Sequence, residues 1–322
     1  MNPVFMRASL LALLCAAPGA TFACTSCGCS LGTDWADQGY FTDGGLHLDL
    51  RYDFVDQNQL RRGSHKVDKS TLEFPNDDEI QQGTLTRFYT VGADYAFSRD
   101  WGINVQLPVL DREHETIDEG ETDVATSHTR GIGDLRILAR YQGLFADRST
   151  GIQFGLKLPT GAIHDTFNSG PNEGEGIDRG LQNGSGTTDL LLGAYNLGNF
   201  GSGFGSRFER FEQIQLKQAL NHREQFRPST QLSLNLALSY TGLPYVTPQL
   251  QLNGKFEGRE VGAQADYDNS GSRTLYLSPG VTIKVLKSLS AYSFVQLPLY
   301  QDYNGYQLAP HYLLSVGLRY AI

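Results

Sequence analysis

The sequence predicts an all-β protein, a transmembrane antiparallel β-barrel of about twelve strands after a signal peptide and a short cysteine-rich segment. Three observations lead to this prediction. Polar and apolar residues alternate strictly in many segments, and the connections between these segments alternate between long and short. Gly (36), Tyr (16) and Phe (17) are abundant, as expected for strands joined by tight turns. No apolar run reaches the ~18 residues that a membrane-spanning helix needs.

Residues 1–23 are typical of a signal peptide. Arg7 precedes an apolar stretch at residues 8–17, and small residues, Thr21 and Ala23, stand where a signal peptidase reads them. Cleavage before Cys24 would export the protein. We therefore divide the chain into a signal peptide (1–23), a cysteine-rich N-terminal segment (24–44) and an outer-membrane barrel (45–322).

The cysteine-rich segment contains Cys24, Cys27 and Cys29 within six residues. Three thiolates at this spacing can hold a soft metal ion such as Cu(I) or Zn(II). A local disulfide in an oxidising compartment is the alternative that we favour, and it would leave one thiol over. Lipidation of Cys24 is a third interpretation of the cysteine cluster. We otherwise expect no cofactor.

The alternation is clearest at residues 231–240. Leu232, Leu234, Leu236 and Leu238 fall on one face of a strand, and polar or small residues fall on the other. A period of two with one apolar face indicates a sheet that is wet on its second side. The expected strands are 45–57, 83–97, 100–110, 131–145, 150–160, 186–198, 207–218, 230–241, 246–256, 274–286, 289–300 and 311–321.

The connections between these strands favour a bacterial outer-membrane barrel over a soluble sandwich. Long polar connections follow the odd strands, at residues 57–82, 111–130, 161–185 and 257–273, with shorter ones at 219–229 and 301–310. Brief turns follow the even strands. Such barrels have long external loops, short periplasmic turns and an even number of strands. This topology predicts that both termini are periplasmic.

Two similar motifs open even strands. Gly131-Ile132-Gly133-Asp134-Leu135-Arg136 and Gly186-Thr187-Thr188-Asp189-Leu190 flank Leu156-Lys157-Leu158-Pro159-Thr160-Gly161 in the chain. For Asp134 and Asp189, a turn at the start of a strand and a role in the pore are equally good interpretations. In this order the three motifs resemble the outer-membrane family labelled MetA pathway of phenol degradation. The resemblance implies a barrel with a transport role and no catalytic residues. Ile322 departs from the terminal aromatic residue usual in such barrels.

Charged residues on the polar faces are candidates for lining a pore. They carry both signs, so they can pair across the lumen or line a wet channel. The candidates are Asp49, Arg51, Asp53, Asp94, Asp134, Arg136, Arg140, Lys157, Asp189, Lys217, Lys255, Lys284 and Arg319.

The functional prediction is a channel or transporter for small solutes, including hydrophobic or aromatic ones. The alternative is a scaffold that does not transport, with a periplasmic cysteine segment that binds metal or a redox partner. We do not expect an enzyme. Ser64-His65 and Ser127-His128 lie in predicted loops, and adjacent residues of a strand point to opposite faces, so their adjacency is no evidence of a catalytic pair.

Outer-membrane lipid and lipopolysaccharide are expected partners. Nucleic acid is not, since the net charge is −9. The oligomeric state is left open. Seven carboxylates at residues 111–123 can bind divalent cations or form a solvated loop.

Overall fold

The computed structural model describes residues 45–322, where alternating side chains point to opposite faces of one sheet. In β10 (Gln231–Tyr240), Asn235 is 1% exposed while its neighbour Leu236 is 36% exposed. In β7 (Thr150–Leu158), Gln153 is buried and Phe154 exposed. A soluble protein buries its apolar face and leaves the polar one in water, so this reversed arrangement requires hydrocarbon around the sheet. The chain is a transmembrane β-barrel, as the sequence predicts.

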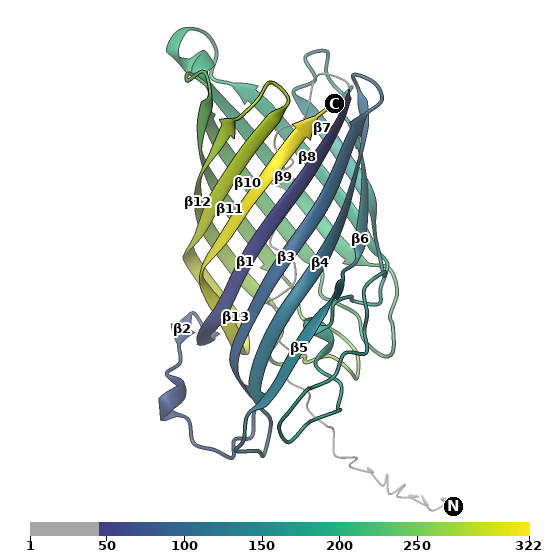
Figure 1. Cartoon of the computed structure of the whole chain (residues 1–322), viewed down its shortest axis with the longest axis vertical. Coiled ribbons are helices and arrows are strands. Elements are labelled where there is room, and N and C mark those ends of the chain that lie inside the picture. The colour runs from purple at the N-terminus through teal and green to yellow at the C-terminus, as the bar shows by residue number, and fades with distance from the viewer. Residues whose placement is uncertain (1–44) are drawn as a thin grey trace, which may run out of the picture.

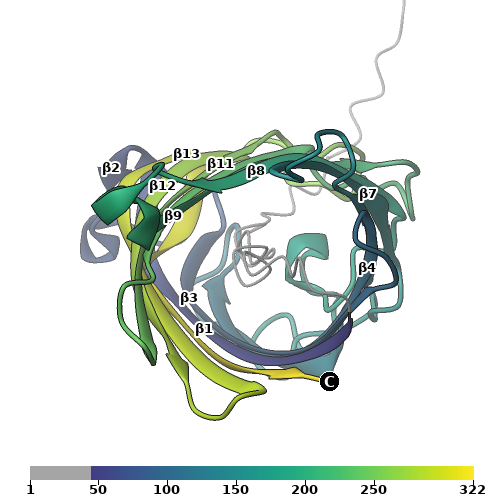
Figure 2. The same ribbon diagram turned by 90° about the horizontal axis from the view of Figure 1, so that it is seen from above.

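The sheet is an antiparallel meander that closes on itself, and Figure 2 shows the resulting ring. Consecutive barrel strands pair with one another, and the last pairs with the first. The eleven barrel strands are β1 (Gly45–Gly63), β3 (Ile80–Ala96), β4 (Trp101–Ile117), β6 (Leu135–Tyr141), β7, β8 (Asp189–Asn199), β9 (Phe208–Ala219), β10, β11 (Val246–Glu257), β12 (Ser272–Lys284) and β13 (Leu289–Ala321). Outside this ring, β2 (His65–Lys66) pairs with β1, and β5 (Ala125–Ile132) pairs with β4.

Strand β13 crosses the barrel twice. Its first part pairs with β12, and its second part pairs with β1. The chain turns back around Gly305, whose φ of 60° suits a glycine. The backbone N–H of Ala321 donates to the carbonyl of Ser288 (2.8 Å), so the two parts run side by side. The ring therefore has twelve passes, and only an even number allows every neighbour to be antiparallel. The expected loop at residues 301–310 is instead part of this strand.

The region between β4 and β6 also differs from the prediction. Residues 111–130 were expected to form a loop, but β4 continues to Ile117 and pairs with β5. Outside the membrane a strand can have polar side chains on both faces. It continues because the hydrogen bonds to the neighbouring strand still satisfy its backbone N–H and C=O groups. The expected strand 131–145 is divided at Gly133, whose N–H donates to the carbonyl of Pro108 (2.8 Å).

The two ends of the barrel differ, as Figure 1 shows. Long connections gather at the end opposite the C-terminus, and they include η3 (Lys69–Thr71) and η4 (Arg179–Leu181). Short turns and η5 (Gly203–Arg207) lie at the C-terminal end. Aromatic pairs mark both edges of the apolar band. The ring centres of Trp101 and Tyr141 lie 4.7 Å apart at the short-turn edge, and those of Tyr52 and Tyr89 lie 5.2 Å apart at the other edge. Within the described residues, no helix is long and apolar enough to cross a membrane.

Candidate functional site

The connection from residue 159 to 188 folds into the lumen, and its short helix η4 lies inside the ring in Figure 2. Leu181 is fully buried there and Ile177 is nearly so. The side chain of Gln182 joins the two arms of this inward loop, because it donates to the carbonyls of Asp165 (3.0 Å) and Ile177 (2.9 Å). Arg112 of β4 donates to the carbonyls of Leu181 and Gln182. The inward loop is thus a fixed part of the lumen.

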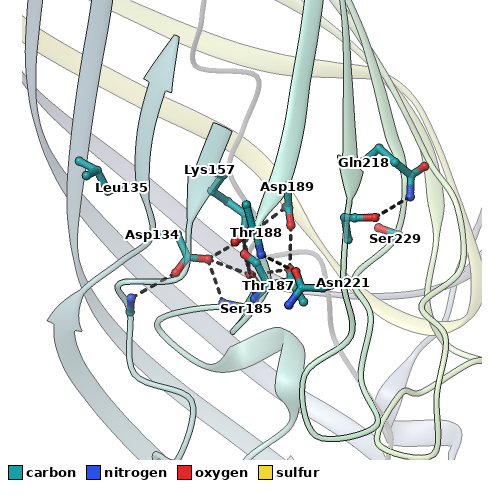
Figure 3. A network of polar contacts seen from close by, with 12 residues as sticks. Asp134, Leu135, Lys157, Ser185, Thr187, Thr188, Asp189, Gln218, Asn221 and Ser229 are labelled. Carbon is teal, nitrogen blue, oxygen red and sulfur yellow. Dashed lines mark hydrogen bonds and ion pairs between the residues drawn. The ribbon is translucent and has the colours of Figure 1, made fainter. Parts of the chain in front are cut away.

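A buried ion cluster anchors the base of this loop (Figure 3). The ammonium of Lys157 lies 2.7 Å from a carboxylate oxygen of Asp134 and 3.2 Å from one of Asp189. All three side chains are at most 9% exposed. Lys157 also donates to the hydroxyl of Ser185 and to the carbonyl of Thr187 (3.3 Å). We call Asp134, Lys157, Ser185 and Asp189 the lysine clamp.

The lysine clamp holds both ends of the loop to the barrel wall. Asp134 accepts hydrogen bonds from the backbone N–H of Gly161 (3.1 Å) at one end and of Ser185 (3.0 Å) at the other. Asp189 accepts one from the hydroxyl of Thr187 (2.7 Å). The three motifs singled out in the sequence therefore meet at one point, although only their order in the chain was visible there.

A pocket of about 130 Å³ lies between the barrel wall and the inward loop. Phe88, Pro108 and Leu110 from the wall, together with Phe226 from the connection after β9, supply apolar contacts. The charged lining comprises six cations and four carboxylates. The cations are Arg51, Arg112, Arg136, Lys157, Arg179 and Lys217, and the carboxylates are Asp53, Asp134, Asp189 and Glu260. The predicted candidates thus include seven residues of this pocket: Arg51, Asp53, Asp134, Arg136, Lys157, Asp189 and Lys217.

The remaining candidates lie outside this pocket. Near the short-turn end, Arg140 forms an ion pair with Asp94, and Asp49 accepts hydrogen bonds from the hydroxyl of Tyr292 (3.0 and 3.1 Å). Arg319 lies 3.7 Å from Asp49. Lys255 pairs with the buried carboxylate of Glu257 (2.8 Å), and Lys284 is exposed at the end of β12. These pairs hold opposite charges together on the wall.

A chain of amide side chains, which sequence analysis missed, runs around the other half of the wall. Gln213 donates to Gln153 (2.9 Å), Asn235 to Gln213 (2.9 Å) and Asn253 to Asn235 (3.0 Å). The hydroxyl of Ser278 donates to Asn253 (2.5 Å). We call these five residues the amide belt. The register between strands brings these residues together. The sequence pattern places each of them on an inward face but does not show that they meet.

The amide belt crosses β8 without a contribution from it, because Gly193 stands where a side chain would intervene. A Cβ atom at Gly193 would lie 3.0 Å from the side-chain oxygen of Gln153. The glycine therefore leaves room for Gln153 to reach Gln213 on β9. At the level of the amide belt this half of the lumen wall is neutral and hydrogen-bonded within itself, while Lys157, Lys217 and Lys255 of the same strands lie nearer the long connections.

Carboxylates from several outer connections lie close to one another. Glu79 is buried and accepts a hydrogen bond from Thr116. Desolvation, with the nearby charges of Asp118 and Asp266, raises the pKa of Glu79 well above its usual value. Desolvation and the charge of Glu79 likewise raise the pKa of Asp178. The outer end of the barrel is therefore less negative than its carboxylate count suggests.

Two predicted metal-binding features have different outcomes. Ligand atoms of Asp111 and Glu113, in the acidic segment 111–123, and of His128 on β5 lie within 4.8 Å of one another. Arg87 donates to both carboxylates (3.4 and 2.8 Å), so a guanidinium already offsets part of their charge. Cys24, Cys27 and Cys29 lie outside the described residues, and the choice between disulfide, metal and lipid stays a prediction.

Comparison with known proteins shows the fold. No family model and no curated protein matches the chain. It is similar to an outer membrane channel from Pseudomonas putida F1, with a TM-score of 0.61 and 14% identity over 87% of this chain and 96% of that one. The toluene transporter TbuX of Ralstonia pickettii scores 0.46 (10% identity, 87% and 90% covered). The β domain of the Bordetella autotransporter BrkA scores 0.47 (12% identity, 87% and 100% covered).

These findings define the class of protein. A closed antiparallel barrel with an apolar outer surface, whose fold is shared with an outer membrane channel, is an outer-membrane β-barrel. The two lower scores carry no argument, since a transporter and an autotransporter domain score alike. The resemblance to the family labelled MetA pathway of phenol degradation stays a prediction.

Proposed function

We propose that this protein is an outer-membrane channel for small solutes with a predominantly apolar body, of the size of one aromatic ring. The observation that carries the proposal is the pocket between the wall and the inward loop. Its volume of about 130 Å³ is close to the ~150 Å³ of an engineered apolar cavity that binds benzene. Phe88, Leu110 and Phe226 offer the contacts that such a solute needs.

The inward loop supports a size limit on this transport. It is held by the lysine clamp and by Arg112, and it occupies lumen that would otherwise be open. A solute has to pass between the loop and the wall, where Gly180 and Gly184 present backbone rather than side chains. Compact solutes can use this space, and larger ones cannot.

The proposed orientation places the long connections outside the cell and both termini in the periplasm. Outer-membrane barrels have their long loops outside, and the difference between the two ends of this barrel supports the same arrangement. In this orientation the outer edge of the apolar band contacts lipopolysaccharide. The charged residues of the pocket then lie on the external side of the lumen.

Planar-bilayer conductance and vesicle uptake test the proposal. We expect the purified barrel to give small, discrete conductance steps and to admit benzyl alcohol into vesicles faster than sucrose. Replacing residues 164–183 by a short Gly-Ser linker should raise the conductance and admit sucrose. If neither the intact barrel nor the loop-deleted form conducts or admits either solute, transport is refuted and the scaffold alternative is favoured.

A further inference from the structure

We infer that the preferred solute carries one negative charge beside its apolar ring, as a small aromatic carboxylate does. This inference rests on the proposed function and specifies its substrate class. It starts from the sign of the charges around the pocket. The whole chain has a net charge of −9, yet six cations and four carboxylates line the pocket. Arg179 also pairs with Glu224 (3.2 Å), which lies outside the lining, so an excess of one positive charge remains at the place where a solute would bind.

Three of the four carboxylates of the pocket, those of Asp53, Asp134 and Asp189, are engaged by protein donors. Asp53 accepts from Arg51 (2.8 Å) and from the hydroxyl of Ser315 (2.5 Å). Asp134 and Asp189 share Lys157 within the lysine clamp. A cationic solute would have to displace these donors to find an acceptor. An anionic solute meets a site whose positive charge exceeds its negative charge, in surroundings where burial strengthens the attraction.

Arg112 is one of the six cations that line the pocket. It donates to the hydroxyl of Thr86 (3.1 Å) and to the carbonyls of Leu181 and Gln182. These contacts fix a buried guanidinium, which stays protonated in proteins, against the pocket.

Aromatic and cationic groups also lie next to each other in the lining. The guanidinium carbon of Arg179 is 5.3 Å from the centre of the Phe226 ring. Phe226 and Leu110 can contact the ring of a solute while a neighbouring cation faces its carboxylate. The pocket volume sets the scale at a single ring. An aromatic monocarboxylate satisfies the apolar, electrostatic and size requirements together.

The acidic segment 111–123 at the outer end restricts the solute to a low charge. Arg87 already pairs with Asp111 and Glu113, and the five other carboxylates of the segment repel anions more strongly as the charge of the solute grows. A monoanion carries the smallest negative charge that the cationic pocket can attract, and the acidic segment repels it less than any more highly charged anion. A dianion would be repelled more strongly before it reaches the site.

The test compares three single-ring probes of different charge on the purified barrel. Benzoate is an anion at neutral pH, benzamide is its neutral counterpart, and benzylammonium is a cation. We expect benzoate to bind roughly tenfold more tightly than benzamide by calorimetry, as expected for charge-assisted contacts, and benzylammonium to bind more weakly than either. In bilayers under a KCl gradient, the reversal potential should indicate a preference for chloride.

Matched variants assign the preference to the pocket. Arg136→Gln combined with Lys217→Gln should remove most of the advantage of benzoate over benzamide and shift the reversal potential toward zero. Lys287→Gln, in an exposed short turn, removes the same kind of charge outside the lumen and should leave both unchanged.

The outcomes separate this inference from the proposed function. Conductance and benzamide uptake without any preference for benzoate or chloride would overturn the inference and leave the channel intact. A preference for benzoate that survives in the Arg136→Gln, Lys217→Gln variant would also overturn it. Absence of conductance and of uptake of every probe would instead refute the channel itself.

Discussion

Replacing Lys157 by methionine should release the inward loop. Methionine keeps an unbranched side chain of similar length but removes the ammonium that lies between Asp134 and Asp189 (2.7 and 3.2 Å). The two carboxylates are then buried without the charge that pairs them. Breaking a buried ion pair in this way costs about 3–5 kcal/mol. Since about 1.4 kcal/mol corresponds to a factor of ten, the population of the released loop should rise roughly a hundredfold or more.

The rate of trypsin cleavage within the inward loop reports the population of the released loop. Arg179 is the only Lys or Arg between residues 159 and 188, and its side chain is 7% exposed. When the loop opens and recloses faster than it is cut, cleavage after Arg179 follows the population of the open form. We expect Lys157→Met to be cut at this position at least about a hundredfold faster than the wild type, giving two fragments of defined mass.

Two controls keep this result interpretable. Lys287→Met changes an exposed lysine and should leave the cleavage rate unchanged. The triple variant Asp134→Asn, Lys157→Met, Asp189→Asn leaves no unpaired charge and should recover much of the protection, because replacing all members of a buried ion cluster is often tolerated. If Lys157→Met resists trypsin as well as the wild type does, while the barrel is folded by its mobility on unheated gels, the lysine clamp does not hold the loop.

Three other predictions address the wall, the outer connections and the orientation. Gly193→Ala should break the contact between Gln153 and Gln213 and lower the free energy of unfolding by about 1 kcal/mol, seen as a lower urea midpoint. Because the fold raises the pKa of Glu79, its stabilising contribution is present at low pH and is lost as the pH rises through the raised pKa. Hydrogen exchange of residues 64–79, corrected for its intrinsic pH dependence, should therefore accelerate over that range. An epitope tag at residue 120 should be detected on intact cells, and one at residue 287 should not.

Each of these predictions has a matched comparison. A Cβ atom at Gly254 would meet its nearest neighbour at 3.7 Å, so Gly254→Ala should leave the urea midpoint nearly unchanged. Glu79→Gln cannot ionise and should flatten the pH dependence, whereas an unaltered pH dependence would assign it to another group. Detection of the tag at residue 287 alone would invert the proposed orientation.

Much of the barrel could be predicted because hydrocarbon imposes a simple rule on each strand. At residues 231–240 the leucines face outward and the polar residues inward, and the predicted strand 230–241 differs from β10 by one residue at each end. The rule fails where the strand leaves the membrane. Residues 111–116 are polar on both faces, so their pattern resembles a loop although the backbone continues as β4 to Ile117.

The site was less predictable because its contacts join distant segments. Asp134, Lys157 and Asp189 could each be assigned to an inward face, but their meeting depends on the register of β6, β7 and β8. The inward fold of residues 159–188 depends on the burial of Ile177 and Leu181, two of the few apolar residues in this stretch. No periodic pattern marks such a segment, so sequence analysis placed it among the external loops.

The pairing between β1 and β13 has a consequence for assembly. It joins His47 to Ala321 and Gly63 to Tyr303. The first strand of the barrel can therefore complete its pairing only after the last residues of the chain have been synthesised. Contacts so distant in sequence form slowly, because a long loop must close before they are made. Until then β1 has an unpaired edge, which is prone to aggregation. A truncated chain that lacks the second part of β13 would keep that edge, so cellular quality control could distinguish incomplete chains from complete ones before either reaches its final place.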